Sequence, residues 1–217
     1  MKIPCFIITF KRNTYLRKCI ESLLPESRLD IIVVDNCPDN SAKETADMFG
    51  VKYIPVEQNA GHRVVWTKQL CPTDMPYIVT DCDITVPHKL PWLDLLLQGL
   101  KIDGYNKVGL GLNVRHIPDT YPRKAEVIKH ETRTLYRRKI ADTRFVEMPA
   151  DTTLALYRSG YNHYSVWGTE SNQYTGVCKS LRTVAPFEAM HLTWQEPNPD
   201  NEQYINSILP NSTHWSK

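Results

Sequence analysis

The chain has the length of one sizeable domain and the composition of an ordinary globular protein. Of its 217 residues, 41% are hydrophobic and 23% charged, which excludes a disordered chain, a collagen-like repeat and a small disulfide scaffold. The 26 Lys and Arg against 24 Asp and Glu leave a formal net charge of +2, so no nucleic-acid partner is expected on the basis of charge. Function must therefore be inferred from individual sites.

The sequence also predicts where the protein acts. No stretch approaches the roughly 18 uninterrupted apolar residues that a membrane-spanning helix needs, so no integral membrane segment is expected. The apolar amino terminus reaches Lys11 and Arg12 without a small-residue cleavage site, which favours a first strand over a signal peptide. The six cysteines show no C-x-x-C spacing, which is typical of reduced core thiols. Together these features predict a cytoplasmic protein.

Strand-like and helix-like segments alternate through the first half of the chain. The apolar run 5–10 predicts a first strand, and residues 15–24 have the spacing of a helix. The branched run 30–35 predicts a buried parallel strand, and Ser41 with Glu44 forms a capping box for the next helix. The alternation continues with strand 51–56, helix 61–70, strand 76–80 and helix 90–100.

This alternation predicts an α/β fold with a mostly parallel central sheet flanked by helices. The second half is less regular, with further strands expected at 108–112 and 152–157. Ligands of such folds bind beyond the carboxyl ends of the strands. Polar residues gather at four of these expected ends: Thr9 with Lys11 and Arg12, Asp35 with Asn36, Asn59 with Gly61, and Asp81 with Asp83.

The aspartate pair after the fourth expected strand is the most specific of these signals. Two carboxylates two residues apart repel each other unless a cation or a proton lies between them. Oxygen ligands that are partly exposed suit Mg²⁺ or Mn²⁺. Asp81 and Asp83 therefore allow three interpretations: two solvated acids of a turn, a metal site for a nucleotide-sugar, and a phosphatase-like nucleophile pair.

The third interpretation follows from the sequence Asp81-Cys82-Asp83-Ile84-Thr85, which fits the D-x-D-x-T signature of haloacid-dehalogenase-type phosphohydrolases. In that reading Asp81 attacks phosphorus and Asp83 acts as acid and base. Those enzymes carry the pair after their first core strand and complete it with a later acidic loop. Here three strand–helix units precede the pair and no comparable loop follows it.

The order of the four strand-end elements resembles that of family 2 glycosyltransferases with the GT-A fold. The resemblance rests on Pro4–Arg12 as the first strand, Val33-Val34-Asp35-Asn36, Glu57–Arg63 with its N-x-G element, and Thr80-Asp81-Cys82-Asp83 as the family's D-x-D. It implies that Asp83 holds a Mn²⁺ (or Mg²⁺) ion and that Asp81 reaches the ribose or a water on the metal. It also implies that nucleotide-sugar contacts come from this part of the chain, at Thr9, Lys11, Arg12, Asp35, Asn59, Gly61, Arg63, Asp81 and Cys82.

The resemblance extends into the second half. His191-Leu192-Thr193-Trp194 is similar to the segment of small family 2 enzymes whose histidine completes the metal shell, which makes His191 a candidate ligand. The usual E-D base motif is absent as such. Asp151 and Glu170 are the two candidates for the carboxylate that takes the acceptor proton if the reaction inverts the anomeric carbon.

The resemblance implies a single domain over 1–217, with a nucleotide-sugar-binding half at 1–105 and an acceptor-binding half at 106–217. The expected reaction moves a sugar from a UDP-sugar to a hydroxyl of a glycan or glycoprotein. Residues 115–144 carry nine Lys and Arg against four Asp and Glu. This excess of positive charge indicates either a solvated face or a patch that binds an anionic acceptor or a membrane surface. The length and the sequence pattern of the chain also resemble those of the transferases that large algal viruses use to glycosylate capsid protein. A non-catalytic nucleotide-sugar-binding module remains the further alternative.

Overall fold

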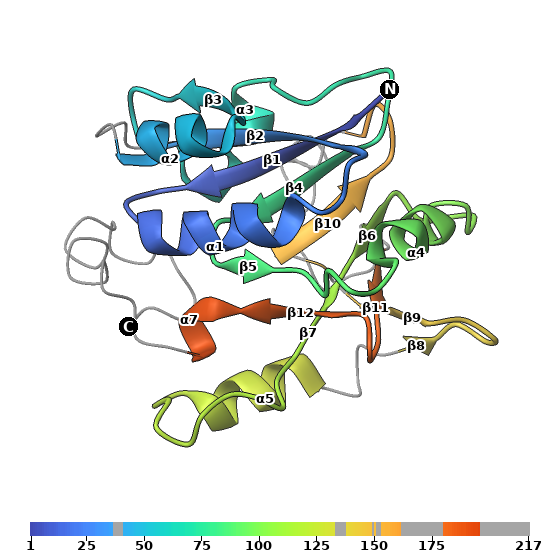
Figure 1. Cartoon of the computed structure of the whole chain (residues 1–217). Helices are drawn as coiled ribbons and strands as arrows, with labels where there is room; N and C mark the ends of the chain where they lie inside the picture. Colours follow the sequence, from blue (N-terminus) through green and yellow to red (C-terminus); the bar gives the residue numbers. More distant parts are fainter. Residues whose placement is uncertain (37–40, 133–137, 149, 151–152, 162–179, 196–217) are drawn as a thin grey trace.

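A nine-stranded sheet forms the centre of the computed structural model, in the order β3-β2-β1-β4-β10-β6-β11-β9-β8 (Figure 1). The structure describes residues 1–36, 41–132, 138–148, 150, 153–161 and 180–195. In the described residues, β10 and β9 run against the direction that the other seven strands share, so the sheet is mostly parallel. The predicted α/β class with a mostly parallel central sheet is confirmed.

The first half follows the predicted alternation closely. Its elements are β1 (Ile3–Thr9), α1 (Asn13–Leu23), β2 (Leu29–Asp35), α2 (Ser41–Phe49), β3 (Lys52–Pro55), the 3-10 turn η1 (Gly61–Arg63), α3 (Val64–Thr67), β4 (Tyr77–Asp81), β5 (Ile84–Thr85) and α4 (Trp92–Gly99). The helix expected at 61–70 is much shorter in the structure. Gly61 has a φ of +69° and Gln69 a φ of 55°, so left-handed residues bound the helical turns on both sides.

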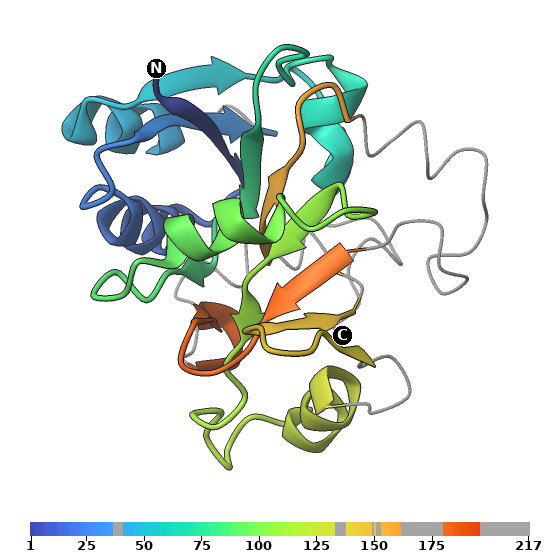
Figure 2. The same cartoon turned by 90° about the vertical axis from the view of Figure 1, so that its right-hand side faces the viewer.

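The second half contains shorter elements. They are β6 (Lys107–Gly109), β7 (Gly111–Leu112), α5 (Lys124–Thr132), β8 (Arg138–Lys139), β9 (Phe145–Glu147), β10 (Thr153–Tyr157), β11 (Ser180–Thr183), β12 (Glu188–His191) and α7 (Leu192–Gln195). A second sheet of order β5-β12-β7 lies beside the main one (Figure 1). In both views α5 lies at the end of the molecule away from β1, β2 and β3 (Figure 2).

Alternate residues of the central strands enter two separate cores. In β1, Cys5 and Ile7 belong to the larger core, which also contains the buried faces of α1, α2 and α4. Phe6 and Ile8 belong to the smaller core with α3 and Tyr157 of β10. Because strand side chains alternate between faces, this arrangement gives three layers with the sheet in the middle. Both faces of the parallel strands are therefore covered, as their unbroken apolar runs require.

The single strand expected at 108–112 is divided between the two sheets. β6 pairs with β10 and β11 in the main sheet, whereas β7 pairs with β12 in the small sheet. The switch depends on Gly111, because a Cβ there would run into the backbone carbonyl of Thr183. The Gly111 N–H also donates a hydrogen bond to the Thr183 hydroxyl over 2.9 Å.

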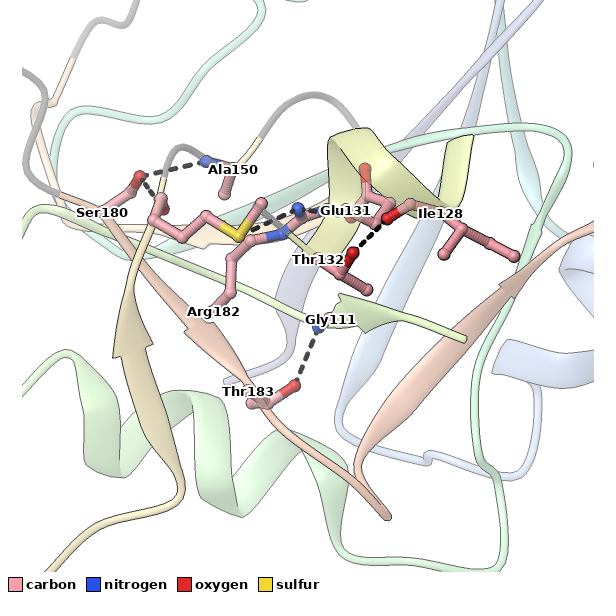
Figure 3. A network of polar contacts seen from close by, with 9 residues as sticks. Gly111, Ile128, Glu131, Thr132, Ala150, Ser180, Arg182 and Thr183 are labelled. Atoms are coloured by element: carbon pink, nitrogen blue, oxygen red, sulfur yellow. Dashed lines mark hydrogen bonds and ion pairs between the residues drawn. The ribbon is translucent and has the colours of Figure 1, made fainter. Parts of the chain in front are cut away.

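A buried polar network joins α5 to β11 (Figure 3). Arg182 donates to the Glu131 carboxylate over 2.8 Å, and the two side chains are only 5% and 8% exposed. Two residues earlier in β11, Ser180 donates to the Met148 carbonyl over 2.8 Å and accepts from the Ala150 N–H over 3.0 Å. The network therefore fixes the path of the chain leading into residue 151.

The cysteines in the described part of the chain are free thiols. Cys5, Cys19 and Cys82 are buried and Cys71 is partly buried. This agrees with the expectation of reduced core residues. Among the helices of the described ranges, none is both long and apolar enough to cross a bilayer.

Candidate active site

Strand register brings the predicted polar residues to one edge of the main sheet. Thr9 at the end of β1 pairs with Asp35 at the end of β2, and Ile8 pairs with Asp81 at the end of β4. The chain then turns, with the Cys82 N–H donating to the Ile8 carbonyl over 3.1 Å. The carboxyl ends of three adjacent parallel strands therefore meet at this edge, where an open α/β sheet binds its ligand.

Asp83 is one of two almost fully buried acidic residues at this edge. Its side chain is 4% exposed, and Oδ2 accepts hydrogen bonds from Arg12 Nη1 over 2.7 Å and from the Thr193 hydroxyl over 2.6 Å. The Nδ1 atom of His191 lies 3.7 Å from the same oxygen. The structure thus brings together Arg12, Asp83 and His191, which come from three separate parts of the sequence.

The backbone holds this group in place. Asp83 lies in the turn between β4 and β5, and its carbonyl accepts from the Leu192 N–H over 2.7 Å. β5 pairs antiparallel with β12, with Ile84 opposite His191. The His191 ring also stacks on the Trp194 ring, with centroids 4.3 Å apart. The small sheet therefore fixes His191 and Thr193 against the strand-end aspartate.

The Asp83 carboxyl is a stable anion despite its burial. Burial alone would raise its pKa, but the charges of His191 and Arg12 and the Thr193 hydroxyl outweigh burial and hold the pKa below its usual value. An ionised carboxylate with the nitrogen of a neutral imidazole at this distance fits the donor set of a divalent ion. Octahedral bonds of about 2.1 Å place adjacent ligands about 3 Å apart, so a small approach of the two side chains suffices.

The predicted metal trio is only partly assembled. Within the described residues, no group of three or more His, Cys, Asp and Glu side chains is arranged to hold a metal ion. Asp83 and His191 lie together, and Asp81 is partly exposed at the end of β4. Two protein donors suit Mg²⁺ or Mn²⁺, which usually keep several waters and bind substrate phosphates.

Asp35 forms a second polar position on the neighbouring strand. It is 1% exposed, and Oδ2 accepts from the Tyr53 hydroxyl over 2.9 Å. The adjacent Asn36 donates to the Gly61 carbonyl over 3.1 Å and accepts from the Ala60 N–H over 3.3 Å. These bonds attach the loop before η1 to the end of β2.

The remaining predicted donor contacts lie around these two carboxylates. The exposed Asn59 accepts from the Gly61 N–H over 2.8 Å, and Arg63 Nε donates to His62 over 3.3 Å. Lys11 has a φ of 52° in the turn after β1. The Cys82 side chain is buried in the larger core, so a donor contact there would have to come from its backbone. Thr9 is buried at the end of β1.

Both candidates for the catalytic base, Asp151 and Glu170, lie outside the described residues. Sequence reasoning missed two residues of the site. Thr193 and Tyr53 each donate a hydroxyl to a strand-end carboxylate. They come from a distant helix and a distant strand and had no local signal. Asn36, which was expected at the strand end beside Asp35, donates to the loop before η1.

Comparison with known proteins agrees with this geometry. The sequence model described as glycosyl transferase family 2 matches residues 5–164. Two uncharacterized proteins of Acanthamoeba polyphaga mimivirus are similar to the chain. L137 is 30% identical over 110 residues, covering 43% of this chain and 15% of its own. L138 is 26% identical over 238 residues, covering 99% of this chain and 27% of its own. The chain thus spans about a quarter or less of these relatives.

Solved structures share the fold at low sequence identity. A mannosyltransferase from Pyrobaculum calidifontis, in complex with GDP-Man and Mn²⁺, has a TM-score of 0.58 at 10% identity, covering 94% of this chain and 60% of that one. Glucosyl-3-phosphoglycerate synthase from Mycobacterium tuberculosis, with Mn²⁺ and UDP-glucose, has a TM-score of 0.50 at 13% identity, covering 83% and 68%.

The family match includes the whole strand-end region, from β1 past Asp83 to the end of β10. The match covers the segments that hold all four polar strand ends, whereas the phosphohydrolase interpretation is based on Asp81 and Asp83 alone. The resemblance inferred from the sequence is therefore confirmed: the chain belongs to glycosyl transferase family 2 and has the GT-A fold of glycosyltransferases.

Proposed function

We propose that this protein transfers a sugar from a UDP-sugar to a hydroxyl of a glycan or glycoprotein, with inversion at the anomeric carbon and with a Mn²⁺ or Mg²⁺ ion. The observation that carries the proposal is the alignment of Asp35, Thr9 and Asp81 on adjacent parallel strands, with Asp83 directly beyond. Two strand spacings separate Asp35 from Asp81, about 10 Å. This matches the scale of a nucleotide lying across the strand ends with its diphosphate at Asp83.

Donor binding is assigned to the β2 side of this edge. The buried Asp35 carboxylate suits the N3–H of uracil or a ribose hydroxyl, and the Tyr53 hydroxyl orients it from behind. Thr9 lies next to it in register and supplies a polar group for the base edge. These residues bind and orient the donor and take no part in bond breaking.

Leaving-group stabilisation is assigned to the β4 side. A bound divalent ion supplies Lewis-acid stabilisation of the diphosphate that leaves. Asp83 and His191 are the residues that would hold it, and Asp81 is placed to reach the ribose or a water. Lys11, Arg12 and Arg63 are the cationic side chains of the loops at this edge, and they add charge for the diphosphate.

For the base that deprotonates the acceptor, we propose Asp151, with Glu170 as the second candidate. Thr153, two residues after Asp151, pairs with Thr80, next to Asp81, which supports this choice. On the other side of Asp151, the Ala150 carbonyl accepts from the buried Lys107 ammonium. Among the described residues, no comparable contact supports Glu170 as the base.

The acceptor is proposed from chemistry and from the relatives. The solved structures of this fold include a complex with GDP-Man and another with UDP-glucose, so the fold accommodates either nucleotide. The two relatives come from a mimivirus, which is consistent with a glycan or glycoprotein acceptor such as a viral capsid protein. The acceptor half is assigned to residues 106–217.

A thermal-shift screen tests the donor without any acceptor. Ligands that bind only the folded protein raise its apparent stability by RT ln(1 + [L]/Kd), about 2.7 kcal/mol at a hundredfold excess over Kd. UDP-sugars are expected to raise the unfolding temperature with Mn²⁺ present and much less with EDTA. GDP- and TDP-sugars serve as matched ligands and are expected to act weakly.

Two results of related assays would overturn the proposal. If a UDP-sugar binds but UDP is never released with any hydroxyl acceptor or water, the protein is a binding module. If para-nitrophenyl phosphate is hydrolysed through a phosphoryl-enzyme at Asp81, the aspartate pair performs phosphohydrolase chemistry.

A further inference from the structure

The Asp83 carboxylate already has a cationic partner from the protein itself. Arg12 Nη1 lies 2.7 Å from Asp83 Oδ2, and the two side chains are 11% and 4% exposed. Thr193 donates to the same oxygen, and His191 Nδ1 faces it at 3.7 Å. The groups that neutralise Asp83 therefore converge on the oxygen that lies nearest the candidate histidine ligand.

A guanidinium and a divalent ion cannot both occupy this oxygen without a large cost. Like charges a few ångströms apart repel each other where water is largely excluded, and the repulsion is doubled for a divalent ion. Removing Arg12 from the pair without a replacement is also unfavourable, because it leaves a buried carboxylate unpaired. One cation must therefore replace the other.

The position of Arg12 offers its side chain a second anionic partner, the donor diphosphate. Arg12 directly precedes α1, and Lys11 before it has a φ of 52°, a region that residues other than glycine rarely adopt. This turn follows Thr9, so Arg12 lies at the same edge of the sheet as Asp35 and Asp81. A guanidinium binds phosphate oxygens through two parallel hydrogen bonds.

We propose that Arg12 is an exchangeable counter-ion: it neutralises Asp83 in the donor-free protein and moves to the donor diphosphate when a divalent ion takes the carboxylate. This inference rests on the proposed function. Competition from Arg12 weakens metal binding in the absence of donor, and the diphosphate relieves that competition by accepting the guanidinium. Metal and nucleotide then bind cooperatively, and the coupling is reciprocal.

The test measures Mn²⁺ binding by electron paramagnetic resonance, with and without UDP, and uses no activity assay. Arg12→Gln removes the charge and keeps a long polar side chain. Without UDP it is expected to bind Mn²⁺ about tenfold more tightly than the wild-type protein, because both the competitor and the repulsion are gone. With Mn²⁺ present it is expected to bind UDP several-fold more weakly, because the guanidinium is missing.

The control is Arg17→Gln, on the helix that Arg12 precedes, where the exposed guanidinium contacts only the Met48 sulfur among its described hydrogen bonds. It is expected to match the wild-type protein in both titrations. Arg12→Lys keeps a cation beside Asp83 and is expected to bind Mn²⁺ within about twofold of the wild-type protein while still losing UDP affinity. This variant serves if Arg12→Gln does not fold.

The proposal requires that Arg12→Gln strengthens Mn²⁺ binding and weakens UDP binding. Unchanged or weaker Mn²⁺ binding by Arg12→Gln overturns the exchange, and so does unchanged UDP binding. If the wild-type protein binds Mn²⁺ and loses it in Asp83→Asn, the metal site of the proposed function stands whatever Arg12 does. If Asp83→Asn binds Mn²⁺ as the wild-type protein does, the metal assignment itself fails. Absence of Mn²⁺ binding in both the wild-type protein and Arg12→Gln overturns the exchange as well.

Discussion

Two carboxylates at the strand ends, Asp35 and Asp83, are almost fully buried, and different partners stabilise each of them. Asp83 is held by a guanidinium, a hydroxyl and a nearby imidazole, whereas the hydrogen bond described for Asp35 is from the Tyr53 hydroxyl. A hydrogen bond to a charged group contributes about 1.5–3 kcal/mol. Tyr53 is therefore a determinant of how well Asp35 is oriented for the donor.

Replacing Tyr53 tests this assignment. Tyr53→Phe removes the hydroxyl but keeps the ring, so Asp35 loses its orientation and UDP affinity is expected to fall about five- to tenfold. Isothermal titration with UDP in the presence of Mn²⁺ gives the measurement. Tyr105→Phe is the matched control, because Tyr105, which precedes β6, also donates to a carboxylate, that of Glu147 in β9, over 2.6 Å. Equal affinity of Tyr53→Phe and the wild-type protein would contradict the assignment of Asp35.

The buried thiols predict the behaviour of the protein at high pH. Burial raises the pKa of Cys5 and of Cys82 to about 12, whereas an unfolded cysteine has a pKa of about 8.5. The unfolded chain therefore loses these protons first, and the free energy of unfolding falls as pH rises from about 8.5 to 12. Cys5→Ala should lessen that slope by about 1.4 kcal/mol per pH unit. Urea titrations between pH 8 and 10.5 measure it, and identical slopes would refute the burial argument.

Single residues also show how far the sequence predicts the site. Asp35, Asp81 and Asp83 were predicted because each lies beside an apolar run, a local signal. The contacts of Asp83 with its partners were not predicted, since Arg12 is 71 residues and Thr193 is 110 residues from Asp83 in the sequence. Arg12 was expected to contact the nucleotide-sugar. Its ion pair with Asp83 forms only when β1 and β4 pair. Long-range contacts of this kind leave no periodicity in the sequence.

At the scale of elements, β1, β2 and β4 were predicted well because both of their faces are buried. β1, β2 and β4 are continuous apolar runs, and α2 begins at the Ser41 of the predicted capping box. The two-residue strands and the split of 108–112 between sheets were not predicted. Their positions depend on close approaches between distant segments, such as Gly111 against Thr183.

The buried ion pair between α5 and β11 gives the element-scale prediction. Arg182→Met leaves Glu131 buried without its partner, so the free energy of unfolding should fall by about 3–5 kcal/mol. The double variant with Glu131→Leu should recover most of that loss, because it leaves no unpaired charge in the core. Urea unfolding with a tryptophan fluorescence readout measures both.

A surface pair that involves the small sheet provides the control. Arg115→Met breaks the contact of Arg115, which is 56% exposed, with Glu188, and should cost less than about 1 kcal/mol. If Arg182→Met is as mild as Arg115→Met, the buried pair does not hold α5 in place. If the double variant is no better than the single one, the packing of the two side chains matters more than their charge.

At the scale of the whole molecule, the candidate site joins both halves of the sequence. β1, β2 and β4 supply one side, and β12 with α7 returns from near residue 190 to supply His191 and Thr193. β10 and β6 continue the main sheet beyond β4, so elements of the proposed acceptor half pair directly with the nucleotide-binding strands. This arrangement supports placing donor and acceptor on either side of the β4 end.

The central claim is that sugar transfer depends on a divalent ion held by Asp83. The most direct measurement is the rate of UDP release from a UDP-sugar, with and without Mn²⁺, by the wild-type protein and by Asp83→Asn. Asp94→Asn, at an exposed position of α4, is the matched control. The account predicts at least a hundredfold loss of the Mn²⁺-dependent rate in Asp83→Asn and none in Asp94→Asn. An unchanged rate in Asp83→Asn would contradict the account.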